Sequence, residues 1–187
     1  TLSYAGGRYR IQPAAPVTFV DSNPRPLVPP LLPGRLNIAA MNVLNYFITF
    51  GGPDDRGARD AEEFARQKEK VIAALSALNA DVLGLIEIQN SSAAVQDILD
   101  ALNAAVGLGT YAAVADPAVG AGGDAIRTVL LYKVAKLQTV GVCYADNDTV
   151  WNTPDPLRLP LAQVFQEISS GERFIACMNH WKSKSPG

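Results

Sequence analysis

Residues 81–88 read DVLGLIEI, a nearly continuous apolar run that follows Asp81 and carries a carboxylate, Glu87, close to its end. An apolar run of this length is typical of a strand that is buried on both faces in the middle of a sheet. A carboxylate within it is expected to be buried as well, and a buried charge requires a partner or a metal ion. This stretch therefore predicts the centre of the fold and one candidate functional residue.

Amphipathic helices are predicted on both sides of this strand. Before it, Asp60 and Glu63 form a capping-box-like start, and the following residues place apolar side chains on one helical face. After it, residues 91–107 repeat the amphipathic pattern, which stops at Gly107. The residues of the two apolar faces include Phe64, Val71, Leu75, Leu78, Val95, Ile98, Leu99, Leu102 and Val106.

Strands are predicted before and after these helices. Residues 35–41 (RLNIAAM) form a strand, and residues 42–60 form a loop rich in Gly, Asp and Arg. Five strand candidates follow the second helix, at 111–115, 127–133, 137–143, 161–168 and 173–179. This order predicts an α+β domain in which helices cover one face of a sheet. The strand residues expected in the core include Leu83, Leu85, Val129, Leu131, Phe165 and Ile175.

The beginning of the chain has a different character. Within residues 1–14, one short strand is predicted at 9–12, after a Gly-Gly turn and without a partner nearby in sequence. Residues 15–34 are a Pro-rich linker, because seven of the 13 prolines lie between Pro13 and Pro33 and such density favours an extended, stiff connector. The main domain is predicted to span residues 35–187.

The composition limits the possible partners. The chain has 187 residues, of which 48% are hydrophobic, enough for one ordinary core. Its net charge of −2 gives no general attraction to nucleic acid, so a polyanionic substrate needs a local basic patch or bound cations. No apolar run approaches the ~20 residues of a membrane span. Cys143 and Cys177 are compatible with two buried small side chains or with one disulfide.

Three polar residues follow or end apolar strand runs: Asn42, Glu87 and His180, the single histidine of the chain. A rigid sheet can direct the side chains at its strand ends to one point. Taken alone, Asn42 is compatible with a turn residue and His180 with a histidine at the rim of the core. Glu87 is harder to explain in this way, and the three together predict a functional site.

Five motifs occur in the order MNVLNYF, LIEIQN, GGDAIRTVLLYK, PLAQVF and NHWKSK. From residue 35 onward the sequence therefore resembles the secreted bacterial nucleases of the endonuclease/exonuclease/phosphatase superfamily, relatives of deoxyribonuclease I. The segment YAGGRYRIQP with its linker resembles the end of the small β-barrel domain that precedes the nuclease domain there. The resemblance implies a layered α/β/β/α sandwich, of which residues 35–187 are roughly the first half.

The resemblance also implies roles for the three polar residues. Asn42 and Glu87 would help to hold Mg²⁺, or alternatively Mn²⁺ or Ca²⁺, hard cations that suit amide and carboxylate oxygens. His180 would lie beside the scissile phosphate, where an imidazole can donate a hydrogen bond or transfer a proton.

Other motif residues are weaker candidates. Asp124 is a further catalytic candidate, and Arg127 and Lys182 are candidate substrate contacts, although each is also compatible with a turn residue or a solvated cation. The loop that begins at residue 43 carries Arg56, Arg59, Tyr46 and Phe47, which suit either a nucleic-acid backbone contact or a solvated turn.

The implied function is divalent-metal-dependent phosphodiester hydrolysis of DNA or RNA by a secreted enzyme, through in-line attack of water. No protein partner is implied. The water-activating motifs of the family belong to its later half, so residues 35–187 alone are expected to be inactive. One alternative is an enzyme of the same fold that cleaves a phosphomonoester or a phospholipid head group, because fold alone does not decide the substrate. Another is a non-catalytic binding module, which would have no need of Asn42, Glu87 and His180.

Overall fold

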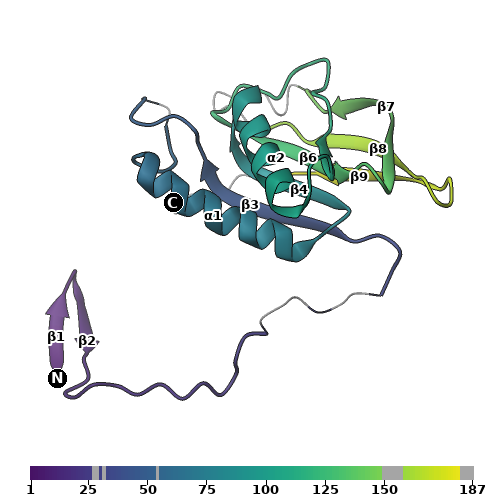
Figure 1. Ribbon diagram of the computed structural model, residues 1–187. Helices are drawn as coiled ribbons and strands as arrows, with labels where there is room; N and C mark the ends of the chain where they lie inside the picture. The colour runs from purple at the N-terminus through teal and green to yellow at the C-terminus, as the bar shows by residue number, and fades with distance from the viewer. Residues whose placement is uncertain (27–29, 31–32, 54, 149–157, 182–187) are drawn as a thin grey trace.

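The computed structural model describes residues 1–26, 30, 33–53, 55–148 and 158–181 (Figure 1). Lys182, a predicted substrate contact, lies outside the described residues. No helix in the described part of the chain combines the length and the apolar composition needed to cross a membrane.

A four-stranded sheet with the order β3-β4-β6-β5 forms the centre of the domain. β3 (Ile38–Tyr46) runs parallel to β4 (Val82–Gln89), whereas β6 (Ile126–Lys133) pairs antiparallel with both β4 and β5 (Tyr111–Ala113). β4 thus has a neighbour on each side, and its first four residues are buried. The central strand predicted from the run DVLGLIEI is confirmed.

Two helices cover one face of this sheet, α1 (Ala61–Leu78) and α2 (Ser92–Val106) (Figure 1). Each helix is capped at its N-terminus by a side chain that accepts a hydrogen bond from a backbone N–H of the first turn. In α1, the Glu63 N–H donates to Asp60 Oδ1 at 2.8 Å, and in α2, the Ala94 N–H donates to Ser91 Oγ at 3.2 Å. The predicted apolar faces pack on the sheet in one core cluster. Its members include Val71, Leu75, Leu83, Leu85, Ile98, Leu102, Val129 and Leu131.

A second sheet packs on the other face of the first. It is antiparallel with the order β7-β8-β9 and consists of β7 (Leu137–Ala145), β8 (Leu161–Glu167) and β9 (Arg173–Met178). The side chains between the two sheets form a second core cluster, which includes Val82, Leu130, Leu137, Leu161, Phe165 and Met178. The layers are therefore helices, sheet and sheet, which confirms the predicted α+β sandwich.

The two sheets approach closely at Gly84 in the middle of β4. A Cβ atom added to Gly84 would lie 2.4 Å from Sδ of Met178 at the end of β9. Glycine at this position therefore allows the second sheet to pack closely on the first. This close packing also determines where the residues after β9 lie.

The prediction that Ile175 is a core residue is wrong, because its side chain is 63% exposed. Residues of a strand alternate between the two faces. In β9, Phe174, Ala176 and Met178 turn toward the first sheet, so Ile175 and Cys177 lie on the outer face. The alternation was visible in the sequence, but its phase depends on which face meets the other sheet.

The loop predicted for residues 42–60 begins later than expected. β3 continues to Tyr46, and the side chains of Tyr46 and Phe47 are almost completely buried. Neither aromatic ring is therefore available to a nucleic acid, which corrects that part of the prediction. The apolar character of these residues serves the core instead.

The beginning of the chain also differs from the prediction of one strand without a neighbour. β1 (Leu2–Ala5) and β2 (Arg8–Ile11) form an antiparallel hairpin around Gly6 and Gly7. Both cysteine thiols are free, with Cys143 buried and Cys177 exposed. The structure thus contains no disulfide between them, and only Cys143 is the buried small side chain that was expected.

Candidate active site

Asn42 and Glu87 meet at the carboxyl ends of the two parallel strands. Asn42 is opposite Ile86 in the register of β3 and β4, so the next residue of β4, Glu87, lies beside it. The Asn42 amide donates a hydrogen bond to Glu87 through Nδ2 and Oε1, at 2.7 Å. The two side chains therefore converge on one point, as their positions at the strand ends predict.

The backbone around this pair is strained. Leu44, Asn45 and Glu87 have φ angles of 58°, 50° and 69°, in the left-handed region that residues other than glycine rarely adopt. The register of β3 and of β4 also shifts here. As a result the Asn45 N–H faces Glu87 and donates to Oε2 at 3.1 Å. Strain of this kind is often concentrated at functional sites.

Gln67 of α1 holds the strained end of β3 in place. Its Nε2 donates to two backbone carbonyl oxygens, that of Val43 at 2.9 Å and that of Leu44 at 2.7 Å. Two donor hydrogens on one amide nitrogen can satisfy both acceptors. A helix on the outer layer thereby fixes the turn that presents Asn42 and Asn45 to Glu87.

His180 comes to the same point from the second sheet. It follows β9, and its Nε2 lies 3.5 Å from Oε1 of Glu87, with only 12% of the His180 side chain exposed. This distance is longer than an ordinary hydrogen bond. The three residues singled out in the sequence are thus brought together from three strand ends and two sheets.

Arg158 completes this group, and the sequence reasoning missed it. Its Nε–H donates to Nδ1 of His180 at 3.1 Å, and its Nη1 lies 3.2 Å from Oδ2 of Asp124. Because Nδ1 accepts this bond, neutral His180 carries its proton on Nε2, toward Glu87. Arg158 therefore sets the tautomer of the histidine.

The pKa of His180 is lowered. Burial is the main cause, and the positive charge of Arg158 adds to it, whereas Glu87 and Asp124 act in the opposite direction. The imidazole therefore stays neutral to a lower pH than usual. Near neutrality its Nε2–H is a neutral hydrogen-bond donor.

Asp124 lies next to Arg158, and its predicted catalytic role stays a prediction. Its carboxylate is buried and accepts from Arg158 on one oxygen, while Arg56 Nη1 lies 3.2 Å from the other oxygen. The backbone N–H of Ile126 also faces this oxygen, at 3.3 Å. Asp124 thus orients Arg158, which in turn orients His180.

Arg127 lies elsewhere in β6. Its side chain is buried, and its guanidinium forms an ion pair with Asp116. This pairing fits a structural role for Arg127, and its predicted contact with substrate stays a prediction.

Among the site residues, the carboxylate of Glu87 is suited to bind a hard divalent cation. No group of three or more His, Cys, Asp or Glu side chains that could hold a metal occurs among residues 1–181 where the structure describes them. Asn42 directs its Nδ2 to Glu87 and its Oδ1 to the N–H of Leu44, at 2.8 Å. Glu87 is therefore the better ligand, and Mg²⁺ commonly takes one or two carboxylates together with water and phosphate oxygens.

A strand-pairing argument could have found Arg158. β8 is antiparallel to β9, with Leu161 opposite Met178, so the residues just before β8 and just after β9 lie at the same end of the sheet. Arg158 and His180 occupy these two places. The signal is a lone arginine directly before an apolar strand, but its use requires knowledge of which strands pair.

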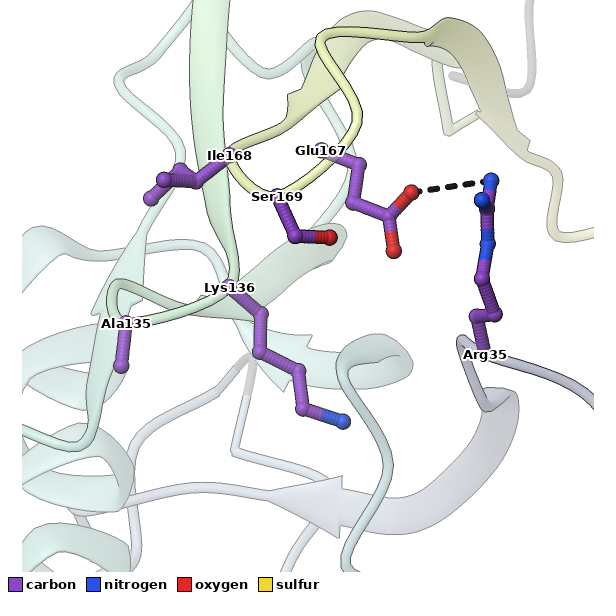
Figure 2. A pocket seen from close by; sticks show the side chains of 6 residues that line it. All are labelled: Arg35, Ala135, Lys136, Glu167, Ile168 and Ser169. Carbon is purple, nitrogen blue, oxygen red and sulfur yellow. Dashed lines mark ion pairs between the residues drawn. The ribbon is translucent and has the colours of Figure 1, made fainter.

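A second polar cluster lies at the opposite end of the sheets, where β3 and β4 begin. It lines a pocket of about 420 Å³, in which Arg35 points toward Glu167 across 3.0 Å (Figure 2). Buried Asp81, directly before β4, pairs with Lys133 and Lys136 at 3.2 and 3.1 Å. Ion pairs thus connect the residues of this cluster, which joins the two sheets at the end away from His180.

The fold resembles two solved structures, those of a humanized D. rerio TDP2 with 14 mutations and of the human Nocturnin catalytic domain with bound sulfate anion. Their TM-scores are 0.54 and 0.53, each at 15% identity, and each match covers 80% of this chain. The chain spans about half the length of both structures, 51%. No protein-family model and no curated protein matches the sequence. The likeness shows the fold, a sandwich of two sheets with helices on one face.

Proposed function

We propose that this chain belongs to a divalent-metal-dependent phosphodiesterase that hydrolyses nucleic acid. The observation that carries the proposal is the meeting of Glu87, Asn42 and His180 at the ends of β4, β3 and β9, at 2.7 and 3.5 Å. A scaffold of this fold has no packing need for a carboxylate, an amide and an imidazole at one point. The sulfate bound in the Nocturnin structure is a tetrahedral anion like phosphate, which supports the same ligand class.

Each residue has a role that its contacts suit. Glu87 would hold the cation, which when bound offsets negative charge on the phosphate. Asn42 and the Asn45 N–H hold both oxygens of Glu87 in position. His180 directs Nε2–H to a phosphoryl oxygen, and Arg158 keeps the proton on that nitrogen. Since each match covers only 51% of the solved structure, we expect the groups that activate water to come from the part of the fold that the match does not include.

Binding of Mn²⁺ tests the proposal without relying on turnover. Titration of the protein with Mn²⁺, followed by electron paramagnetic resonance, should show a site that Glu87→Gln weakens strongly, because an amide replaces the charged ligand. Glu69→Gln, an exposed glutamate of α1, is the matched control and should bind as the unaltered protein does. Equal Mn²⁺ affinity in the unaltered protein and in Glu87→Gln would contradict the proposal.

The secreted location rests on the motif resemblance and belongs to the same proposal, in which the substrate is DNA or RNA. A phosphomonoester or phospholipid substrate would need the same metal and histidine. These alternatives therefore differ from the nucleic-acid reading only in the contacts made beyond the scissile phosphate.

A further inference from the structure

The loop between β3 and α1 holds two arginines in different surroundings. Nη1 of Arg56 lies 3.2 Å from Asp124, within the candidate site. Arg59, three residues later, pairs with Glu63 at 3.0 Å on the first turn of α1. Both residues are cations of the same loop, but their side chains have different partners. Arg56 contacts the candidate site, whereas Arg59 contacts the helix.

Arg56 is held at the site by its backbone. A Cβ atom on the next residue, Gly57, would lie 2.5 Å from the carbonyl oxygen of Asn45 and 2.8 Å from Cβ of Phe47. The loop therefore rests directly on the end of β3. On the other side, Asp55 accepts from Thr49 Oγ1 and from the Gly52 N–H, both at 2.7 Å. These contacts hold the loop against the end of β3, from where the Arg56 guanidinium reaches Asp124.

Arg56 and Arg158 both contact Asp124 but differ in exposure. The Arg158 side chain is 11% exposed and is tied to His180, whereas the Arg56 side chain is 51% exposed. A ligand arriving from solvent can therefore reach Arg56 at the rim of the site. Asp124 would keep Arg158 and the Ile126 N–H as partners if Arg56 turned to a ligand. The exchange leaves no buried charge unpaired.

We propose that Arg56 binds a backbone phosphate next to the scissile one, so that the site takes a nucleic-acid strand rather than a small phosphoester. This inference rests on the proposed function, which names nucleic acid as the substrate, and adds to it a residue that holds the strand beside the scissile phosphate. A guanidinium suits phosphate because it offers several donors in a planar fork. The chain has a net charge of −2, so attraction to a polyanion has to come from local cations of this kind.

The salt dependence of binding tests the inference. The protein is titrated into a fluorescently labelled DNA duplex and followed by anisotropy at several salt concentrations. One lost phosphate contact lowers the slope of log K against log salt by about 0.9. Arg56→Ala should show this loss and weaker binding to every sequence, while Arg56→Lys should restore most of the slope. Arg59→Ala is the matched control and should bind as the unaltered protein does.

Two outcomes would overturn the inference. The first is an equal loss of slope in Arg56→Ala and Arg59→Ala, which would mean that the loop acts only through its total charge. The second is no binding of duplex or single-stranded oligonucleotide by a protein that still binds Mn²⁺ through Glu87. In that case the metal site stands, but nucleic acid is lost as the substrate in the inference and in the proposed function alike, whereas the first outcome overturns only the role of Arg56. Circular dichroism of each variant confirms that the proteins compared are folded.

Discussion

His180 owes its chemistry to two neighbours on different elements. Arg158 donates a hydrogen bond to Nδ1 of His180, and Oε1 of Glu87 lies 3.5 Å from Nε2. An imidazole between a fixed donor and a carboxylate has one tautomer and one direction for its proton. We therefore propose that His180 donates its Nε2–H to a phosphoryl oxygen of the substrate.

His180→Ala should therefore lower turnover far more than stability. In the whole protein we expect kcat for Mg²⁺-dependent plasmid cleavage to fall by roughly 10²–10⁴-fold, the usual range for a proton-donating group. The melting temperature, measured on the same preparation, should change little. A variant with full activity and a clearly lower melting temperature would show that His180 is a packing residue.

At the scale of single elements, the end of β3 is held in a conformation that its own sequence does not favour. Leu44 and Asn45 have positive φ angles, and Gln67 on α1 holds the carbonyl oxygens of Val43 and Leu44. The helix and the strand end are therefore coupled, and the helix helps to shape the site although it contributes no catalytic group.

Gln67→Ala should loosen this turn. Loss of the amide leaves two carbonyl oxygens without their donor, which is expected to cost about 1–3 kcal/mol in the free energy of unfolding. The affinity for Mn²⁺ should fall as well, because the Asn45 N–H is no longer fixed 3.1 Å from Glu87. Gln96→Ala, which removes an exposed bond to Asp100 on α2, serves as the control in urea unfolding and in Mn²⁺ titration. Unchanged Mn²⁺ affinity in Gln67→Ala would refute the coupling.

The contact between the two sheets gives a second prediction at this scale. Gly84→Ala places a methyl group where Sδ of Met178 now lies, and overpacking of this kind costs about 1–3 kcal/mol. Met178 has to move, and His180 follows it by two residues. Met178→Ala removes the clashing group, so the double variant should lose less stability than the sum of the two single changes. Additive losses in urea unfolding would mean that the clash is relieved elsewhere.

At the scale of the whole molecule, two charged clusters lie at opposite ends of the two sheets. At the end with Glu87 and Asp124, the exposed Arg56 can leave Asp124 to bind a ligand. At the opposite end, Lys133 and Lys136 form ion pairs with buried Asp81. Burial by itself raises the pKa of Asp81. The Asn37 N–H, Lys136 and Lys133 outweigh this effect, so the net pKa of Asp81 is lowered.

Asp81 should therefore contribute stability that depends on pH. A lowered folded-state pKa means that the contribution is present above the unfolded pKa, about 3.9, and is lost as the pH falls through the folded value. Asp81→Asn should cost about 1–3 kcal/mol at pH 7, and the difference from the unaltered protein should shrink toward pH 3. Urea unfolding from pH 7 to pH 3 measures this, with exposed Asp21→Asn as the control. A difference that stays constant with pH would contradict the assignment.

Local sequence patterns were sufficient for the elements of the main domain. The apolar run around Leu85 predicted the central strand. The start at Asp60 and Glu63, the stop at Gly107 and the spacing of the apolar residues predicted both helices. These patterns depend on hydrogen bonds and burial within a few residues, which is why they can be read without the fold. The convergence of Asn42 and Glu87 also followed from their places at the strand ends.

The tertiary structure alone decided which faces meet and which distant residues become neighbours. Ile175 is exposed because Phe174 and Met178 of the same strand face the first sheet. The alternation of residues along the strand does not tell which of its two faces points inward. Arg158 reaches His180 only because β8 and β9 pair in one register, and Arg56 reaches Asp124 only because Gly57 rests on β3. The physical reason is that pairing register and sheet packing are properties of two segments at once, whereas a sequence pattern describes one segment at a time.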